Sequence, residues 1–152
     1  NNTLPRAWFV NKTEVVSEED VWNKIMQPDF DPRNIAYVPN EVSVSSGSQV
    51  SITHFEKSIH RITMSTESDG NHFLVLSEVF YPLRWKAKID GEEMQTHIVN
   101  GILRGVVVPT GKHTIEFIYD KSAFNKGLTI SFVSFVMALG FIGLGYFGNK
   151  KS

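Results

Sequence analysis

Cysteine is absent from the 152-residue sequence, which excludes disulfide bonds, thiolate catalysis and cysteine-based zinc sites. An excess of charge of one sign is also lacking, because 15 Lys and Arg stand against 16 Asp and Glu. Proteins that bind nucleic acid carry a basic face or stripe, so nucleic acid is not an expected partner. The hydrophobic fraction of 41% and the charged fraction of 20% are typical of a globular domain.

Motifs that carry chemistry are missing as well. Gly105 to Lys112 resembles a phosphate-binding loop, but five residues separate its glycines and His113 occupies the position of the magnesium-binding hydroxyl. The five His residues form no HExxH pair, and no Ser lies in a Gly-x-Ser-x-Gly turn. Asp29 and Asp31 could form a metal-binding carboxylate pair, although the flanking prolines favour a turn. We therefore predict no catalytic, cofactor-binding or metal-binding residue.

Charge is missing from one long segment, Gly127–Asn149, which contains no Asp, Glu, Lys, Arg or His. A helix needs roughly 20 apolar residues to cross a hydrocarbon core about 30 Å thick. We predict a transmembrane helix over 127–149, a cytoplasmic tail over 150–152 and a domain over 1–126. The lipid bilayer is the expected partner of this helix. Other transmembrane helices are expected partners as well, because Ser134 and Ala138 supply a small-xxx-small pair that allows close helix packing.

The orientation depends on lysines at both ends of this segment. Lys150 and Lys151 favour a cytoplasmic C-terminus, although Lys121 and Lys126 lie on the other flank. We expect the domain over 1–126 to be extracytoplasmic.

One short helix is predicted near 18–27, with Ser17 as its N-cap and Pro28 beyond its end. Apolar residues at positions 21 and 25, and at 22 and 26, form i,i+4 pairs that favour packing on a sheet.

From Ile35 onward the apolar period changes to two, which is typical of strands. "RWKAKID" places Trp85, Ala87 and Ile89 on one face, and Asp90-Gly91 predicts a hairpin turn. The returning strand is expected to continue to Ile98. "ILRGVVVP" and "KHTIEFIYD" predict another hairpin, and "HFLVLSEVF" predicts a central strand. Earlier strands are predicted at 36–38, 41–45, 49–55 and 58–66.

Short strands with turn signals between them predict a mainly β fold, an antiparallel β-sandwich of immunoglobulin-like or jelly-roll-like type. Within it, Tyr81, Trp85 and Arg104 are candidate glycan contacts. Trp85 lies on the apolar face of its strand, so packing in the core is the alternative.

A set of motifs resembles the C-terminal region of the YfhO-like family of bacterial multi-spanning membrane proteins. The resemblance rests on "YPLRWKAKIDGEE", on Asn100 and Arg104, on "VVVPTGKHTIEFIY", and on "LPRAWFV" and "DPRNIAYV" near the start. The sequence departs from the family pattern at Arg84 and Gly105, where Gly and Ala are more usual.

The resemblance implies a C-type glycosyltransferase-like parent in the bacterial cell membrane, which uses a polyprenyl-phosphate sugar donor on cell-envelope glycopolymers. It implies that the catalytic acid lies in an early loop outside this sequence, so the chain would be an accessory β-domain plus the last transmembrane helix. The alternative is a membrane-tethered carbohydrate-binding or adhesion module. Cell-envelope glycan is an expected partner in both cases. A pure scaffold that only stabilises its own membrane bundle is a third possibility.

Overall fold

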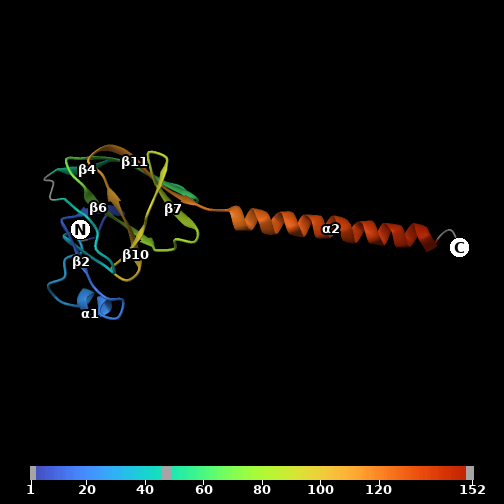
Figure 1. The fold of residues 1–152 in the computed structure, drawn as a ribbon, viewed down its shortest axis with the longest axis horizontal. Helices are drawn as coiled ribbons and strands as arrows, with labels where there is room; N and C mark the ends of the chain where they lie inside the picture. The colour runs from blue at the N-terminus through green and yellow to red at the C-terminus, as the bar shows by residue number, and fades with distance from the viewer. Residues whose placement is uncertain (1–2, 46–48, 150–152) are drawn as a thin grey trace. The chain divides into compact units, whose positions relative to one another are not determined.

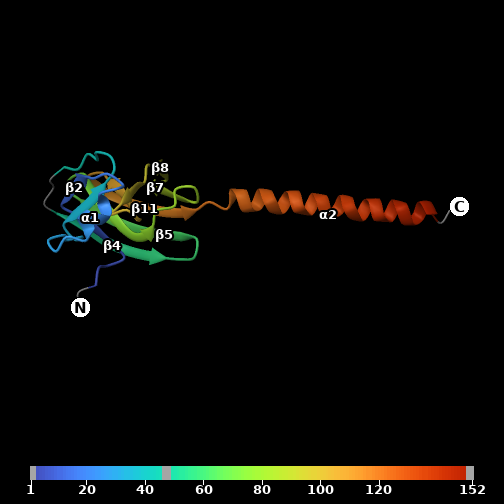
Figure 2. The same ribbon diagram turned by 90° about the horizontal axis from the view of Figure 1, so that it is seen from below.

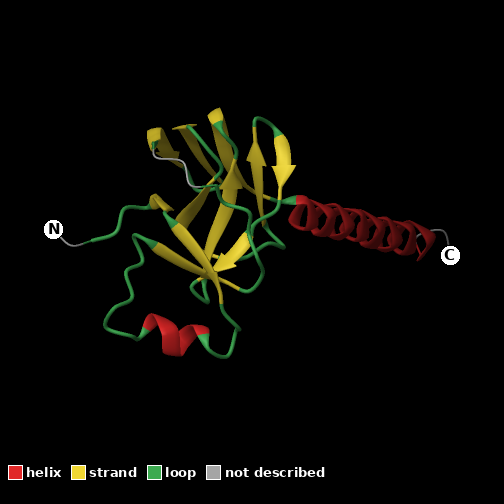
Figure 3. Cartoon of the chain, turned by 60° about the vertical axis from the view of Figure 1, so that its left-hand side comes forward, coloured by secondary structure: helices red, strands yellow, loops and turns green. Residues whose placement is uncertain are grey.

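The computed structural model of the chain describes residues 3–45 and 49–149. Two compact units are present, residues 1–119 and residues 120–152. The first unit contains the strands and one short helix, and the second contains a long helix (Figures 1 and 3). The fold is therefore mainly β, as the sequence predicts. The predicted tail over 150–152 lies outside the described residues.

Two antiparallel sheets build the first unit. One has the strand order β1 (Ala7–Val10), β6 (His72–Val79), β10 (Leu103–Val108) and β9 (His97–Val99). The other has the order β4 (Val50–Lys57), β5 (Arg61–Ser68), β11 (Gly111–Tyr119), β7 (Trp85–Ile89) and β8 (Glu92–Met94).

The main core lies between these sheets and gathers side chains from both of them. Leu74 and Leu76 of β6 pack in one buried cluster with Ile62, Ile115 and Phe117 of the other sheet. Because strands alternate, Phe73 and Val75 point to the opposite face of β6, where they join a second buried cluster. Burial on both faces explains the unbroken apolar run of β6, which is central in its sheet as predicted.

A third layer covers the outer face of the β6 sheet. It consists of a parallel pair of strands, β2 (Lys12–Val15) and β3 (Ile35–Val38), with helix α1 (Val21–Ile25) between them in the chain. Ala36 and Val38 pack on Phe73 and Val75. Tyr37 points the other way and packs with Val21 of α1.

Helix α1 is shorter than the predicted 18–27. The Ser17 hydroxyl accepts a hydrogen bond from the Asp20 backbone N–H at 3.1 Å and donates one to the Asp20 carboxylate at 2.8 Å. These bonds close a turn over 18–20, so Asp20 is the N-cap and no acidic residue lies in the first turn of the helix. Val21 is buried as expected, whereas Trp22 and Met26 are exposed.

Three other predictions are wrong. β10 and β11 do not form a hairpin, because β10 pairs with β6 and β9 while β11 pairs with β5 and β7. The turn at Thr110 and Gly111 instead carries the chain from one sheet to the other. Similarly, the strand after Asp90-Gly91 ends at Met94, and β9 belongs to the opposite sheet. Residues 41–45 form no strand.

The second unit is helix α2 (Ser122–Asn149), which begins five residues before the predicted 127. The Asp120 carboxylate accepts the Ser122 backbone N–H at 2.7 Å. The hydroxyls of Thr129 and Ser134 donate to carbonyls one turn earlier, so both polar groups are satisfied within the helix. Within the described residues, Ser122–Ile142 is the one segment long and apolar enough to cross a membrane, and none of it is buried.

Candidate functional site: a surface cleft beside helix α1

Asp90, Gly91, Gly111 and His113 belong to the motif that resembles the YfhO-like family, and they join two turns through hydrogen bonds. We call these four residues the lock motif. Asp90 and Gly91 have φ values of 51° and 90°, which give the tight turn between β7 and β8. The Asp90 carboxylate contacts His113 Nδ1 at 2.6 Å and accepts the Thr114 backbone N–H at 2.8 Å. His113 Nε2 lies 2.9 Å from the Thr110 carbonyl oxygen.

Both ring nitrogens of His113 face acceptors, which favours the doubly protonated ring. The hydrogen bond that the His113 ring donates to the Asp90 carboxylate, and then the one to the Thr110 carbonyl, raise the pKa of His113. The bond from the Thr114 N–H, followed by that from His113, lowers the pKa of Asp90. The motif thus fastens the β7–β8 turn to the start of β11.

The candidate glycan contacts Trp85 and Arg104 meet inside the sandwich. Arg104 is only 3% exposed, and its guanidinium carbon lies 4.9 Å from the Trp85 ring centroid and 5.7 Å from that of Phe117. Its Nη2 donates to the Val79 carbonyl at 2.7 Å. Burial lowers the pKa of Arg104, and the charge of Glu78 opposes this change. These contacts favour cation–π packing at the end of the core.

Tyr81, the third candidate, is 47% exposed. Its backbone carbonyl accepts the N–H groups of Arg84 and Trp85, which holds the loop before β7. The structure therefore brings Trp85 and Arg104 together and leaves Tyr81 at the surface. A glycan contact by these residues stays a prediction.

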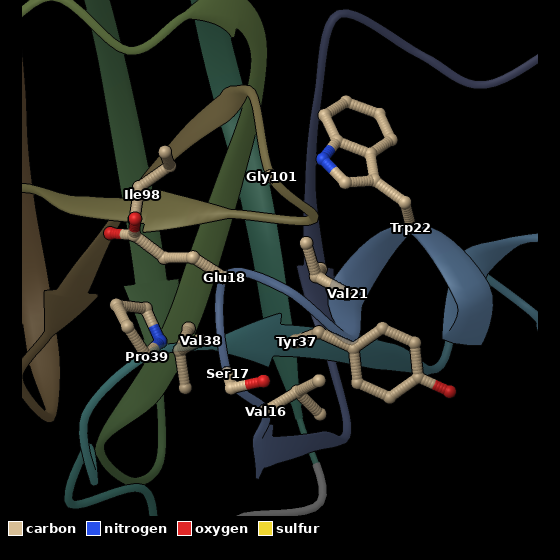
Figure 4. A pocket seen from close by; sticks show the side chains of 10 residues that line it. All are labelled: Val16, Ser17, Glu18, Val21, Trp22, Tyr37, Val38, Pro39, Ile98 and Gly101. Carbon is tan, nitrogen blue, oxygen red and sulfur yellow. The ribbon is translucent and has the colours of Figure 1, made fainter.

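A cleft of about 200 Å³ lies between α1, β3 and the β9–β10 turn. Figure 4 shows the side chains around it, with the Trp22 ring above Val21 in this view. The lining is apolar with a few polar groups, which is the usual composition of small-molecule sites. Its complete lining is Val16, Ser17, Glu18, Val21, Trp22, Tyr37, Val38, Pro39, Ile98 and Gly101.

Asn100 and Gly101 position the Trp22 side of the cleft. Asn100 exchanges hydrogen bonds with Tyr37, since its N–H donates to the Tyr37 carbonyl at 2.9 Å and its Oδ1 accepts the Tyr37 N–H at 2.8 Å. Gly101 has a φ of 76°, and a Cβ built there would lie 3.0 Å from Trp22 Cζ2. The absence of a side chain at Gly101 lets the indole rest against the turn while 52% of Trp22 stays exposed.

The sequence indicates Trp22 only as one member of an apolar helix pair and places Glu18 at the start of the predicted helix, so the cleft is not predicted. The available signal is that Val21 and Trp22 are adjacent and point about 100° apart on a helix, so one of them can lie at the edge of the buried face. Only the position of the β9–β10 turn shows which of the two is left at the surface.

The described residues contain no group of three or more His, Asp or Glu side chains that could hold a metal ion. Asp31 stabilises the predicted turn, because its carboxylate accepts the Arg33 backbone N–H at 3.0 Å and a hydrogen bond from the Asn34 amide.

A β-domain followed by a helix that is apolar along a bilayer-spanning length defines a membrane-associated protein. The comparison with known families agrees with that class. The family model "Bacterial membrane protein YfhO" matches residues 27–131, more than half of the chain, so the chain belongs to this family. The match begins after Glu18 and Trp22 and includes the lock motif. No curated protein and no solved structure matches the chain.

Proposed function

We propose that this chain is the non-catalytic accessory part of a glycosyltransferase-like membrane protein that acts on cell-envelope glycopolymers, and that its cleft binds one sugar unit. The observation that carries the proposal is the half-exposed Trp22 ring at the edge of the cleft. Membership of a bacterial membrane protein family supports the membrane role.

The chemistry of the cleft fits a sugar. One face of a pyranose ring presents C–H groups, which pack favourably on a flat indole such as that of Trp22. The Glu18 carboxylate accepts hydrogen bonds, and sugar hydroxyls are donors. The small volume admits a single ring rather than a long segment of polymer.

The charge of the site favours a sugar without phosphate. Glu18, Glu19 and Asp20 are consecutive and exposed, so an anionic ligand would be repelled. The expected ligand is therefore an uncharged hexose or N-acetylhexosamine unit.

A binding experiment on the full chain in detergent micelles tests the cleft. Neutral oligosaccharides are titrated calorimetrically into the wild type, Trp22→Ala and the matched control Met26→Ala, which alters an exposed residue just beyond α1 and outside the cleft. We expect Trp22→Ala to weaken binding by about tenfold or more, equivalent to about 1.4 kcal/mol, and Met26→Ala to bind normally. Equal affinities for all three proteins would refute the cleft as the sugar site.

Adjacent acidic residues supply a second matched pair. Glu18 lines the cleft and Glu19 does not. Glu18→Gln should weaken binding while Glu19→Gln leaves it unchanged, because both remove one negative charge and only one removes a cleft acceptor. If the two variants behave alike, the carboxylate acts only through net charge.

The non-catalytic, accessory role of this chain is tested separately. The isolated chain should transfer no sugar from a polyprenyl-phosphate donor, and measurable transfer would contradict the accessory role. A membrane-tethered carbohydrate-binding module is the alternative. Under our proposal, Trp22→Ala in the parent protein slows glycopolymer modification, whereas the alternative predicts normal modification and reduced glycan adhesion.

An extracytoplasmic position of the β-domain is part of the proposal. Because the sequence lacks Cys, a single Glu19→Cys variant gives one thiol on the domain. A membrane-impermeant maleimide added to intact cells should label it. Labelling only after cell lysis would place the domain in the cytoplasm.

A further inference from the structure

One end of the β-sandwich carries exposed apolar side chains on two neighbouring loops. Ile59 in the β4–β5 turn is 84% exposed, and Leu83 in the β6–β7 loop is 74% exposed. Tyr81 lies in the same loop as Leu83. We refer to Ile59, Tyr81 and Leu83 as the apolar rim.

Contacts around Tyr119 show that both loops lie at the end of the domain where β11 finishes. The Tyr119 N–H donates to the His60 carbonyl at 2.9 Å, and the two rings are 5.8 Å apart. On its other side, Tyr119 pairs with Trp85 with ring centroids 5.6 Å apart. Figure 2 shows the β4–β5 turn and the loop before β7 beside the tip of β11. The two loops that carry the apolar rim therefore lie at the end of the domain where Tyr119 lies.

The covalent chain ties this end to the apolar helix. Only Asp120 and Lys121 separate Tyr119 from Ser122, the first residue of α2. Three residue steps span at most about 11 Å, whatever their conformation. The 28 residues of α2 rise about 42 Å, which matches a bilayer with its headgroups, about 40–45 Å. Ser122 is then expected at headgroup level, and Tyr119, which contacts residues next to both rim loops, lies within about 11 Å of it.

Charges at this end do not oppose contact with a bilayer. Glu78 is paired with Lys57 and Arg6, and Glu116 is paired with Arg61 at 3.3 Å. Lys121 and Lys126 are exposed on the connecting segment and the start of α2. Paired acids and exposed lysines suit an interface that contains anionic lipid headgroups.

We infer that the apolar rim inserts into the interfacial region of the bilayer and docks the β-domain on the membrane surface. Aliphatic side chains gain by leaving water, and a tyrosine is suited to the headgroup level because its ring is apolar and its hydroxyl is polar. Docking by the rim does not depend on glycan binding by the cleft. The partner is the lipid itself, next to the helix that anchors the chain.

Depth-dependent fluorescence quenching tests the docking on the full chain. Single variants Ile59→Cys and Leu83→Cys are labelled with an environment-sensitive fluorophore and reconstituted into phosphatidylcholine vesicles with a minor fraction of phosphatidylglycerol. Lipids carrying a headgroup-proximal nitroxide quench the rim and control probes, and lipids carrying a nitroxide deep in the acyl chain quench the probe at Phe135, which lies about 20 Å along α2 from Ser122. Met26→Cys is the exposed control outside the rim, and Phe135→Cys in α2 reports on insertion of the helix.

We expect probes at Ile59 and Leu83 to be quenched well above the probe at Met26. Replacing the other rim residue by Asn, as in Ile59→Cys with Leu83→Asn, should lower the docking equilibrium constant by roughly tenfold. A quenched probe at Phe135 with rim probes no more quenched than that at Met26 would overturn the inference. An unquenched probe at Phe135 would overturn it as well, because the helix would not be inserted.

Discussion

At the scale of single residues, the motif that carries the family resemblance has a structural explanation. Asp90, Gly91 and His113 fix one turn and join it to β11. Asn100 joins its own turn to β3 through Tyr37. Arg104 packs between Trp85 and Phe117. These residues hold the sandwich together, so the motif is explained without any catalytic role.

The His113–Asp90 lock makes stability depend on pH. Because the pKa of His113 is raised on folding, its contribution is fully present below about pH 6.5 and is lost as the pH rises through the folded value. The pKa of Asp90 is lowered, so its contribution is present above about pH 4 and is lost as the pH falls through the folded value.

Urea unfolding at about pH 5.5 and about pH 8.5 measures the His113 contribution for the wild type and His113→Gln. We expect the wild type to lose more stability between these pH values than the variant does. Comparing the two proteins removes the pH dependence that comes from the other four His residues, because both proteins contain them. Equal pH dependence would show that His113 is not protonated in the lock.

Gly105 is a second residue at which a substitution is expected to change the stability of the fold. A Cβ there would lie 2.6 Å from Phe73 Cζ and 2.8 Å from Val99 Cγ2, and both of those side chains are fully buried. Gly105→Ala should therefore destabilise the fold by about 1–3 kcal/mol through overpacking. Gly91→Ala is not a matched control because its φ is positive, so Ser77→Ala on exposed β6 surface is used instead. A neutral or stabilising Gly105→Ala would mean that Phe73 has room to move.

At the scale of elements, most strands from Ile35 onward are predictable from the sequence, but their partners are not, and β1 and β2 were not predicted. The alternation in "WKAKI" and the Asp90-Gly91 turn locate β7 and its hairpin, and the apolar run of β6 indicates a central strand. The alternation of apolar and polar residues along a strand indicates which side chains share a face, but it does not indicate which sheet the strand joins. For that reason a hairpin was predicted where β10 and β11 belong to different sheets.

The cleft was not predictable for a related reason. Its walls come from α1, β3 and the β9–β10 turn, which are far apart in the sequence. No local pattern around Trp22 reveals that Gly101 lies against its ring. Trp85 and Arg104, by contrast, come from one motif, and the structure brings them together inside the core.

The contact between the β9–β10 turn and strand β3 is expected to contribute to stability and to the shape of the cleft. Asn100 has a φ of 49°, so Asn100→Gly keeps the turn and removes the side-chain acceptor of the Tyr37 N–H. Stability should fall by about 1–2 kcal/mol, because a buried donor loses its partner. Sugar binding should also weaken, since Tyr37 and Gly101 both line the cleft. Unfolding and calorimetric titration check both effects, and unchanged stability would contradict this role.

At the scale of the whole molecule, only Asp120 and Lys121 separate the β-domain from the apolar helix α2. The sandwich buries its own core, with Phe73, Phe117 and Met64 among the fully buried side chains. The apolar window Ser122–Ile142 of helix α2 is not buried against other described residues, as expected for a helix that associates with a bilayer. The absence of charge over 127–149 predicts an apolar helix there, and the structure has α2 over Ser122–Asn149.

The central claim is that α2 anchors the β-domain in a bilayer, and alkaline extraction of membranes tests it most directly. The test compares the full chain with the double variant Phe135→Arg, Leu139→Arg and with the control Phe135→Leu, Leu139→Phe. Each Arg at the helix centre opposes insertion by about 2.5–3.5 kcal/mol. The account predicts that the wild type and the control stay in the membrane pellet while the Arg variant moves to the supernatant. Equal distribution of all three proteins would contradict it.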